Sequence, residues 1–328
     1  MPQMGDKGGK LNRLIIRSPG PGHVSGHSDC GSRRYITIDI CTCDSHVQES
    51  DIELDFRADK ERPMYERWWD LEEPPFINNF DGRFFIESSR TDETTARLQF
   101  LVEHRRQCGV VTGPAGVGKS FMIRNALRTL SAPLPKVAIV DLAGLPYENV
   151  LRDLASALHT PSKDSDSDFV VWRAVIDHLV GGQLADCRTV IVFDHSDQAG
   201  PGGMQVIERL LNLHTSVGGG YTVIASCCQI TSAALQRSAD LQIKVPAMDE
   251  IETTAYIESR LKEAGRDKAI FDSEALAAIY EYSAGVARTV NRLCEMSMLA
   301  AVSDQKQNVN VETVQLVAAE LLTGDAAA

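Results

Sequence analysis

A short glycine-rich run restricts the possible folds of this chain more than any other feature. It reads Gly113-Pro114-Ala115-Gly116-Val117-Gly118-Lys119-Ser120. It fits the pattern G-x-x-x-x-G-K-[ST], in which a loop joins a strand to the start of a helix. The flanking residues supply both elements, because 108–112 is a short apolar strand candidate and the residues from Phe121 onward have the composition of a helix. This arrangement predicts an α/β fold of the P-loop type.

Each residue type in this run suits the binding of a triphosphate. The three glycines allow positive φ and leave the backbone bare, so successive N–H groups can point at phosphate oxygens beside the positive end of the helix. Lys119 is expected to reach the β- and γ-phosphates, and Ser120 to supply one oxygen to Mg²⁺. We therefore predict that residues 113–120, with Phe121 as the next helical residue, bind ATP and Mg²⁺.

Strand and helix candidates alternate around and after this run. The further strand candidates are Val137–Leu142, Thr189–Phe193, Tyr221–Ser226 and Leu241–Val245. The helix candidates are a capped segment from Thr91 to His104, then Tyr147–Leu158, Val170–Val180 and Gln205–His214. Apolar strands that alternate with helices predict a parallel sheet covered on both faces, which is a three-layer αβα arrangement.

After Pro246 the pattern changes to helices alone. Apolar residues recur at helical spacing in Glu250–Ala264, Ser273–Ser283, Val286–Val302 and Val311–Leu322. We therefore predict a nucleotide-binding α/β domain over 64–247 and a helical lid domain over 248–328. Residues 1–63 have no helical periodicity and are predicted to form a poorly ordered extension. An alternative is that Met64 is the true start and the upstream stretch is an over-extended reading frame.

Composition limits where this chain acts and what it binds. The sequence of 328 residues has no apolar run that could cross a bilayer and no signal peptide, so we expect a cytoplasmic protein. Its net charge of −12 argues against extensive sequence-independent binding to DNA, although a local basic stripe is compatible with it. Zinc could in principle be ligated by His23, His27, Cys30, Cys41, Cys43 and His46, but their spacing matches no common zinc module.

An acidic residue completes the predicted nucleotide site. The apolar strand candidate 189–193 ends in Asp194, which is the form of a Walker B element, whose carboxylate holds the water shell of Mg²⁺. The next position, where many such ATPases carry a glutamate that orients the attacking water, is His195. A neutral histidine can polarise water but has no fixed negative charge. Either Asp197 therefore substitutes for the glutamate, or hydrolysis is slow and the protein is a nucleotide-dependent switch.

Further polar residues are candidates for sensing the γ-phosphate. Ser226, Cys228 and Gln229 follow or end the fourth strand candidate, and the sequence does not choose among them. Arg237, before the fifth strand, could reach the γ-phosphate of a neighbouring copy, whereas Arg288 could reach that of its own chain. An arginine that acts on a neighbouring copy would tie catalysis to assembly.

Several longer segments resemble the AAA+ ATPases of the general secretion type, the ExeA/GspA family, and more distantly the TniB/MuB transposition ATPases. The resemblance covers about Met64 to Leu322. It is carried by Met64-Tyr65 with Trp68–Phe76 and Arg83–Phe85, by Thr254–Leu261, by Ser283–Asn291, and by Gln236-Arg237. The opening segment normally lies at the start of such proteins.

The resemblance implies roles for several of these residues. In the family the opening segment lies against the nucleotide, so Phe76 would help to enclose the adenine. Arg288 matches the sensor-2 arginine of the lid, with Ala287 in place of the usual proline. The chain departs from the family pattern in three respects, which are His195, the sequence after the fourth strand and the lack of a transmembrane segment.

The resemblance also implies what the protein works with. It predicts an oligomeric ATPase that couples binding and hydrolysis of Mg·ATP to a change in a partner of the secretion or pilus machinery, with peripheral attachment to the inner membrane through that partner. A slowly hydrolysing switch and a DNA-binding transposition helper remain the alternatives.

Overall fold

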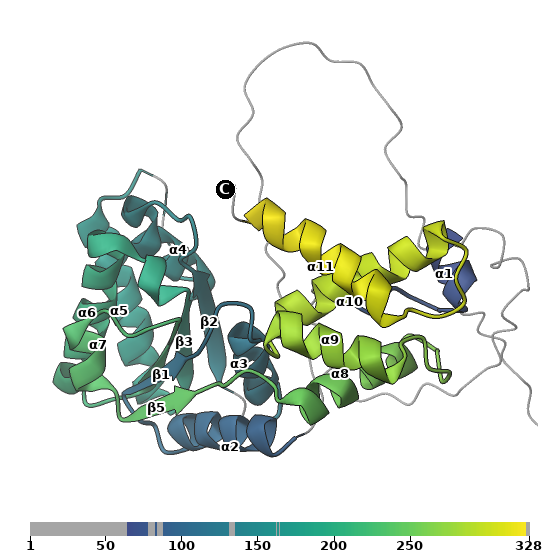
Figure 1. Cartoon of the computed structure of the whole chain (residues 1–328). Coiled ribbons are helices and arrows are strands. Elements are labelled where there is room, and N and C mark those ends of the chain that lie inside the picture. Colours follow the sequence, from purple (N-terminus) through teal and green to yellow (C-terminus); the bar gives the residue numbers. More distant parts are fainter. Residues whose placement is uncertain are drawn as a thin grey trace, which may run out of the picture. The chain divides into compact units, whose positions relative to one another are not determined.

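The computed structural model describes residues 64–77, 83, 88–130, 135–161, 163 and 165–325 (Figure 1). All of them belong to one compact unit, Phe56–Ala328. The predicted extension over 1–63, with its candidate zinc ligands, lies outside the described residues.

A parallel sheet forms the centre of the nucleotide-binding part. Its five strands are β1 Cys108–Thr112, β2 Lys136–Asp141, β3 Thr189–Asp194, β4 Tyr221–Cys227 and β5 Leu241–Lys244. They lie in the order β2-β3-β4-β1-β5, and every paired register is parallel. The strands β3 and β4 are buried along their whole length, which explains their continuous apolar sequence. The carboxyl ends of β1, β3 and β4, where the predicted site residues follow, therefore share one edge of the sheet.

Helices cover both faces of this sheet, as predicted. One core joins the sheet to α4 Val150–Ala157, α5 Asp168–Leu184 and α6 Gly200–Val217. The other joins it to α2 Ser89–Glu103 and α3 Lys119–Arg128. Figure 1 shows the strands between these two sets of helices. The fold is thus the three-layer αβα arrangement.

Three short elements and two helix ends differ from the sequence prediction. The helix α7 Ala233–Ser238 was not predicted, although Ser232 caps it by accepting hydrogen bonds from two backbone N–H groups. The predicted helix Tyr147–Leu158 begins with the 3-10 helix η3 Tyr147–Asn149 before α4, and the 3-10 helix η4 Ser196–Gln198 was not predicted. Helix α6 begins earlier than predicted because Pro201 is tolerated in the first turn. Helix α5 runs through Gly181 and Gly182, so these glycines do not end it.

The C-terminal region is all helical, as predicted. It contains α8 Glu250–Glu263, α9 Ser273–Ser283, α10 Ala287–Ser303 and α11 Val311–Asp325. The segment 64–76, which the sequence grouped with the sheet, contributes to this helical core. It contains helix α1 Met64–Trp69, and its Trp69, Leu71 and Phe76 are buried there. The indole Nε1 of Trp69 donates to the Met298 carbonyl at 3.3 Å, which fixes α1 against α10. No helix in the described part of the chain is long and apolar enough to span a membrane.

Candidate nucleotide-binding site

The glycine-rich loop lies between β1 and α3, where the sequence placed it. Gly116 and Gly118 have φ of 79° and 99°, which is the left-handed region that glycine enters without strain. Gly118 is the N-cap of α3 and provides no side-chain cap. The N–H groups of the first helical turn therefore remain available for phosphate oxygens, next to the positive end of the helix dipole.

The side chain of Lys119 is enclosed by this loop. It is only 8% exposed, and its Nζ donates to the carbonyls of Gly113 at 2.9 Å and Pro114 at 3.0 Å. Its charge is thus held at the centre of the loop, where it attracts an anion.

Two of the loop glycines are also required by close packing. A Cβ on Gly113 would lie 2.3 Å from the Val245 carbonyl oxygen, next to the end of β5. A Cβ on Gly116 would lie 2.7 Å from Cβ of Arg288, at the start of α10. The backbone N–H of Arg288 donates to the Gly116 carbonyl at 3.0 Å. The phosphate loop is therefore in direct contact with the helical region.

Asp194 lies at the carboxyl end of β3 and is buried. Its Oδ1 accepts a short hydrogen bond from the hydroxyl of Ser226 and another, at 3.1 Å, from the N–H of His195. Both bonds hold the charged group in one orientation. Ser226 is fully buried on β4. This position suits the orientation of Asp194 better than contact with a phosphate.

His195 turns toward β2 and not toward β4. Its backbone is left-handed, with φ of 54°, and its Nδ1 lies 2.8 Å from Oδ1 of Asp141. Asp141 ends β2 and pairs in register with Asp194. Asp141 gave no signal in the sequence, because an acidic residue at a strand end can be assigned to a site only when the neighbouring strand is known.

Asp197 lies on η4 and interacts with the opposite side of β3. Its Oδ2 accepts a hydrogen bond from the backbone N–H of Cys228 at 3.0 Å, just after β4. The thiol of Cys228 is 4.0 Å from Nζ of Lys119, and burial raises its pKa while Lys119 opposes that shift. Cys228, one of the three candidates for sensing the γ-phosphate, thus lies beside the loop lysine. Gln229 is exposed.

A basic residue of α3, Arg124, interacts electrostatically with the acidic ends of β2 and β3, Asp141 and Asp194. Burial lowers the pKa of Arg124, and the charges of Asp194 and Asp141 oppose that shift. Arg124 lies four residues after Ser120 on the same helix, so both side chains belong to one helical face. Sequence reasoning missed Arg124, for which only this i, i+4 spacing gave a signal.

The two predicted arginines lie in different surroundings. Arg288 contacts the phosphate loop through its backbone, and its side chain is exposed. Arg237 is exposed on α7 and lines a hollow of about 360 Å³ together with Ser196, Asp197 and Ser232. The structure therefore connects Arg288 to the loop of its own chain and places Arg237 on an open surface.

Phe76 is part of the helical core. Its side chain is 2% exposed, and its ring packs edge-on against that of Phe271, with centroids 6.4 Å apart. The guanidinium of Arg260 donates to the neighbouring Ile77 carbonyl at 3.0 Å and anchors this segment. Contact of Phe76 with an adenine remains a prediction.

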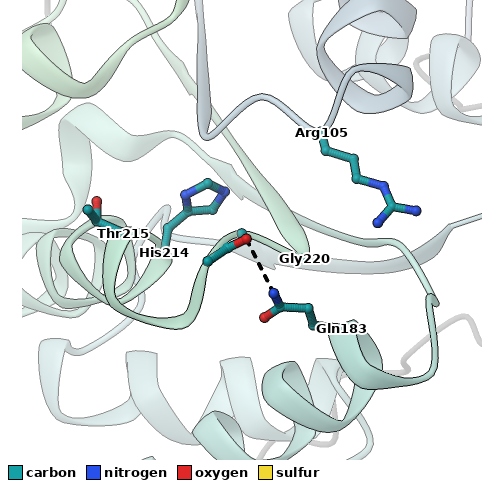
Figure 2. A pocket seen from close by; sticks show the side chains of 7 residues that line it. Arg105, Gln183, His214, Thr215 and Gly220 are labelled. Atoms are coloured by element: carbon teal, nitrogen blue, oxygen red, sulfur yellow. Dashed lines mark hydrogen bonds between the residues drawn. The ribbon is translucent and has the colours of Figure 1, made fainter.

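A second hollow of about 390 Å³ lies at the opposite edge of the sheet (Figure 2). Arg105, Gln183, His214 and the glycines before β4 line it, and Nε2 of Gln183 donates to the Gly218 carbonyl at 3.2 Å. Ligands of parallel sheets bind at the carboxyl ends of the strands. This hollow lies at the amino ends of β1 and β4, so it is not part of the nucleotide site.

The donor set at the loop fits Mg²⁺. Ser120 and Asp194 offer oxygen ligands, which this ion prefers, and Mg²⁺ is usually held by one or two protein groups together with phosphates and water. No cluster of three or more histidine, cysteine, aspartate or glutamate residues is present within the described residues to hold a metal by protein ligands alone.

The strand order, the glycine-rich loop after β1 and the carboxylate at the end of β3 are those of the P-loop fold of the AAA+ type. A family model described as "AAA domain" matches residues 102–228. Solved structures share the fold. They include Drosophila ORC bound to DNA, with TM-score 0.65 and 16% identity over 86% of this chain and 71% of that chain. Aeropyrum pernix ORC1 in complex with DNA has TM-score 0.60 and 17% identity over 75% and 68%.

A curated sequence relative narrows this class. General secretion pathway protein A of Aeromonas hydrophila is 23% identical over 266 residues, which are 79% of this chain and 48% of that protein. The chain is thus similar to general secretion pathway protein A and spans about half the length of this relative.

Proposed function

We propose that this protein binds Mg·ATP in the loop 113–120 and hydrolyses it, and that the helical region converts the state of the nucleotide into a change of affinity for a protein partner. The observation that carries the proposal is the contact between Gly116 and Arg288. Through it, the loop that would hold the phosphates touches the first turn of α10. A shift of the loop on binding or release of the γ-phosphate would therefore act on the lid.

Each group at the site has a defined task in this proposal. Main-chain N–H groups and Lys119 would bind the phosphates, while Ser120 and Asp194 would hold Mg²⁺. The ion would neutralise charge on the β- and γ-phosphates when bound. Arg288 would respond to the γ-phosphate of its own chain, whereas Arg237 would reach that of a neighbouring copy.

Substitution of the loop lysine tests the proposal. We expect Lys119→Ala to weaken ATP binding and to abolish phosphate release, because the ammonium group at the centre of the loop is lost. Binding is measured by calorimetry and release by a continuous phosphate assay, over a range of protein concentrations. Lys268→Ala, at an exposed position, is the control. Phosphate release that survives in Lys119→Ala would contradict the proposed site.

A second function, that of a slowly hydrolysing switch, is favoured by His195. This residue replaces the glutamate that most members of the class use, and the carboxylate of Asp197 is engaged with the backbone of Cys228. His195→Glu distinguishes the two functions. A many-fold rise in turnover would mean that the natural protein hydrolyses ATP slowly and is a nucleotide-dependent switch. A fall in turnover would mean that His195 already orients the attacking water.

The partner is proposed from the named relative. A protein similar to general secretion pathway protein A is expected to act on secretion or pilus machinery from the cytoplasmic side, as a homo-oligomer and through peripheral attachment at the inner membrane. Sedimentation of the purified protein with inner-membrane vesicles, with and without ATP, tests this. Duplex binding in a gel-shift titration that requires ATP and weakens with salt would instead favour the transposition helper.

A further inference from the structure

The strand end that carries Asp194 holds a second acidic group next to it. Asp141 and Asp194 pair in register as the last residues of β2 and β3, so both carboxylates extend from the same edge of the sheet. The side chain of Asp141 is 60% exposed, whereas that of Asp194 is 8% exposed. Asp194 is thus shielded beside Ser226, and Asp141 stands at the open side of the site.

The backbone holds His195 between these two carboxylates. A left-handed conformation is unfavourable for a residue other than glycine, and such residues concentrate at functional sites. Here two hydrogen bonds from the His195 N–H compensate for it, one to Asp194 Oδ1 at 3.1 Å and one to Ser226 Oγ at 3.3 Å. The left-handed turn directs the imidazole toward β2.

The contact with Asp141 fixes which ring nitrogen carries the proton. Oδ1 of Asp141 can only accept a hydrogen bond, so Nδ1 of His195, at 2.8 Å, must donate. The same Oδ1 accepts the Ala143 N–H at 3.0 Å, which restrains the carboxylate although it is exposed. In the neutral imidazole Nε2 then has a free lone pair and is an acceptor. A glutamate at this position would also present an acceptor.

We propose that Asp141 and His195 form an orienting pair for ATP hydrolysis, in which His195 Nε2 accepts a hydrogen bond from the attacking water and Asp141 is the positioning residue. This inference rests on the proposed function. The water oxygen bonds to the γ-phosphorus while the bond to the β,γ-bridging oxygen breaks, and ADP leaves with that electron pair. One water hydrogen stays on the attacking oxygen and the other moves to a γ-phosphate oxygen. The imidazole of His195 neither gains nor loses a proton in this step.

The geometry favours Asp141 over Asp197 as the carboxylate that positions the group in contact with the water. The Oδ2 of Asp197 is bonded to the chain after β4, on the far side of β3 from Asp141. Arg124 of α3, in the second turn after the phosphate loop, interacts electrostatically with both Asp194 and Asp141. The helix that begins at the phosphates therefore lies over the same pair of strand ends as His195.

Kinetics with four variants test the pair. We expect Asp141→Ala and His195→Ala each to lower kcat by about 10- to 100-fold with little change in ATP affinity, since only orientation of the water is lost. The double variant should be no slower than His195→Ala alone, because residues that act as one unit are not additive. Asp141→Asn should retain much of the activity, because its amide oxygen can still accept from Nδ1. Glu148→Ala, at an exposed position beyond the same strand, is the control for loss of one negative charge.

A second readout does not depend on turnover. Nitrogen NMR of the imidazole side chains in the metal-free protein should show His195, identified by its loss in His195→Gln, with the proton on Nδ1. In Asp141→Ala this preference should disappear. An unchanged tautomer in Asp141→Ala would overturn the pair, as would additive losses in the double variant.

The outcomes also separate this inference from the proposed function. A natural protein that fails to bind ATP would contradict the proposed function itself. ATP binding and turnover that Lys119→Ala abolishes but Asp141→Ala leaves unchanged would overturn the orienting pair and leave the proposed ATPase intact. ATP binding without any turnover would overturn the pair and favour the switch.

Discussion

At the scale of single residues, the buried hydroxyl of Ser226 holds Asp194 and His195 in place at the end of β3. Ser226 is fully buried near the end of β4, donates to Asp194 Oδ1 and accepts from the His195 N–H. It thereby holds both the carboxylate and the left-handed residue that follows it. A buried polar atom that loses its partner has a large cost, so this network depends on each member.

The variant Ser226→Ala should therefore be destabilised and impaired at the proposed metal position. We expect the free energy of unfolding to fall by about 1–3 kcal/mol, because Asp194 loses a buried donor. The affinity for ATP in the presence of Mg²⁺ should fall as well. Urea denaturation and calorimetry check these effects. Ser216→Ala, at an exposed helical position, should change neither quantity.

The hollow in Figure 2 leads to a prediction on pH. Burial lowers the pKa of His214, while Asp240 and a hydrogen bond with the Tyr221 backbone oppose the shift. Below the ordinary histidine value of about 6.5 the unfolded chain binds more protons than the folded chain, so stability falls as pH falls.

His214→Gln should make this decline shallower between pH 7 and about 5.5. The measurement is the free energy of unfolding from urea titrations at several pH values for both proteins. Equal slopes in the two proteins would contradict a depressed pKa for His214.

At the scale of elements, the phosphate loop contacts the start of α10 through Gly116 and Arg288, and we call this contact the joint. The Arg288 N–H donates to the Gly116 carbonyl, and Val286 and Arg288 lie close around the position where a Gly116 side chain would be. The carbonyl of Met248 blocks any Cβ on Gly285 at 1.8 Å, so the turn before α10 is equally tight. The start of α10 therefore has little freedom to move independently of the loop.

Gly116→Ala should break this joint. Its φ of 79° is strained for alanine, and the added Cβ would meet Arg288 Cβ at 2.7 Å. We expect ATP to bind at least about tenfold more weakly, which is about 1.4 kcal/mol. Gly218→Ala is a matched control, because Gly218 has the same φ and its nearest neighbour, Gln183 Nε2, is the end of a side chain. Equal ATP affinity in both variants would contradict the role of the joint.

At the scale of the whole molecule, the proposed nucleotide site is built from residues of a single copy, and the exposed Arg237 lies apart from it. Lys119 and the backbone of Arg288 contact the loop 113–120, and Asp194 ends β3 at the same edge of the sheet. Arg237 lines a separate hollow on α7. If Arg237 serves a neighbouring copy, the activity of the protein belongs to the assembly and not to the single chain.

Mixing two inactive variants tests this assignment. Arg237→Ala lacks the arginine but keeps its own loop, and Lys119→Ala lacks the loop lysine but keeps Arg237. Each alone should release little phosphate, and their mixture should regain a clear fraction of the natural activity. Analytical ultracentrifugation checks that both variants assemble. A mixture that is no more active than its components would place the task of Arg237 within its own chain.

The sequence predicted those parts of the site that are written in consecutive residues. Local backbone geometry and apolar periodicity determine three of these features. They are the phosphate loop, the strand β3 with Asp194, and the change from alternating elements to helices. Short-range patterns of this kind do not depend on what lies next to them in space. For the same reason the sequence predicted the three-layer arrangement, since apolar parallel strands must be covered on both faces.

Tertiary structure decided which strand ends are neighbours. Asp141 gained its place beside His195 only through the order and register of β2 and β3, which join residues 54 positions apart. Likewise, Trp69 and Phe76 were placed in the helical core by packing against residues more than a hundred positions away. Local propensity carries no information on such contacts, because they form where distant apolar surfaces and strand edges meet.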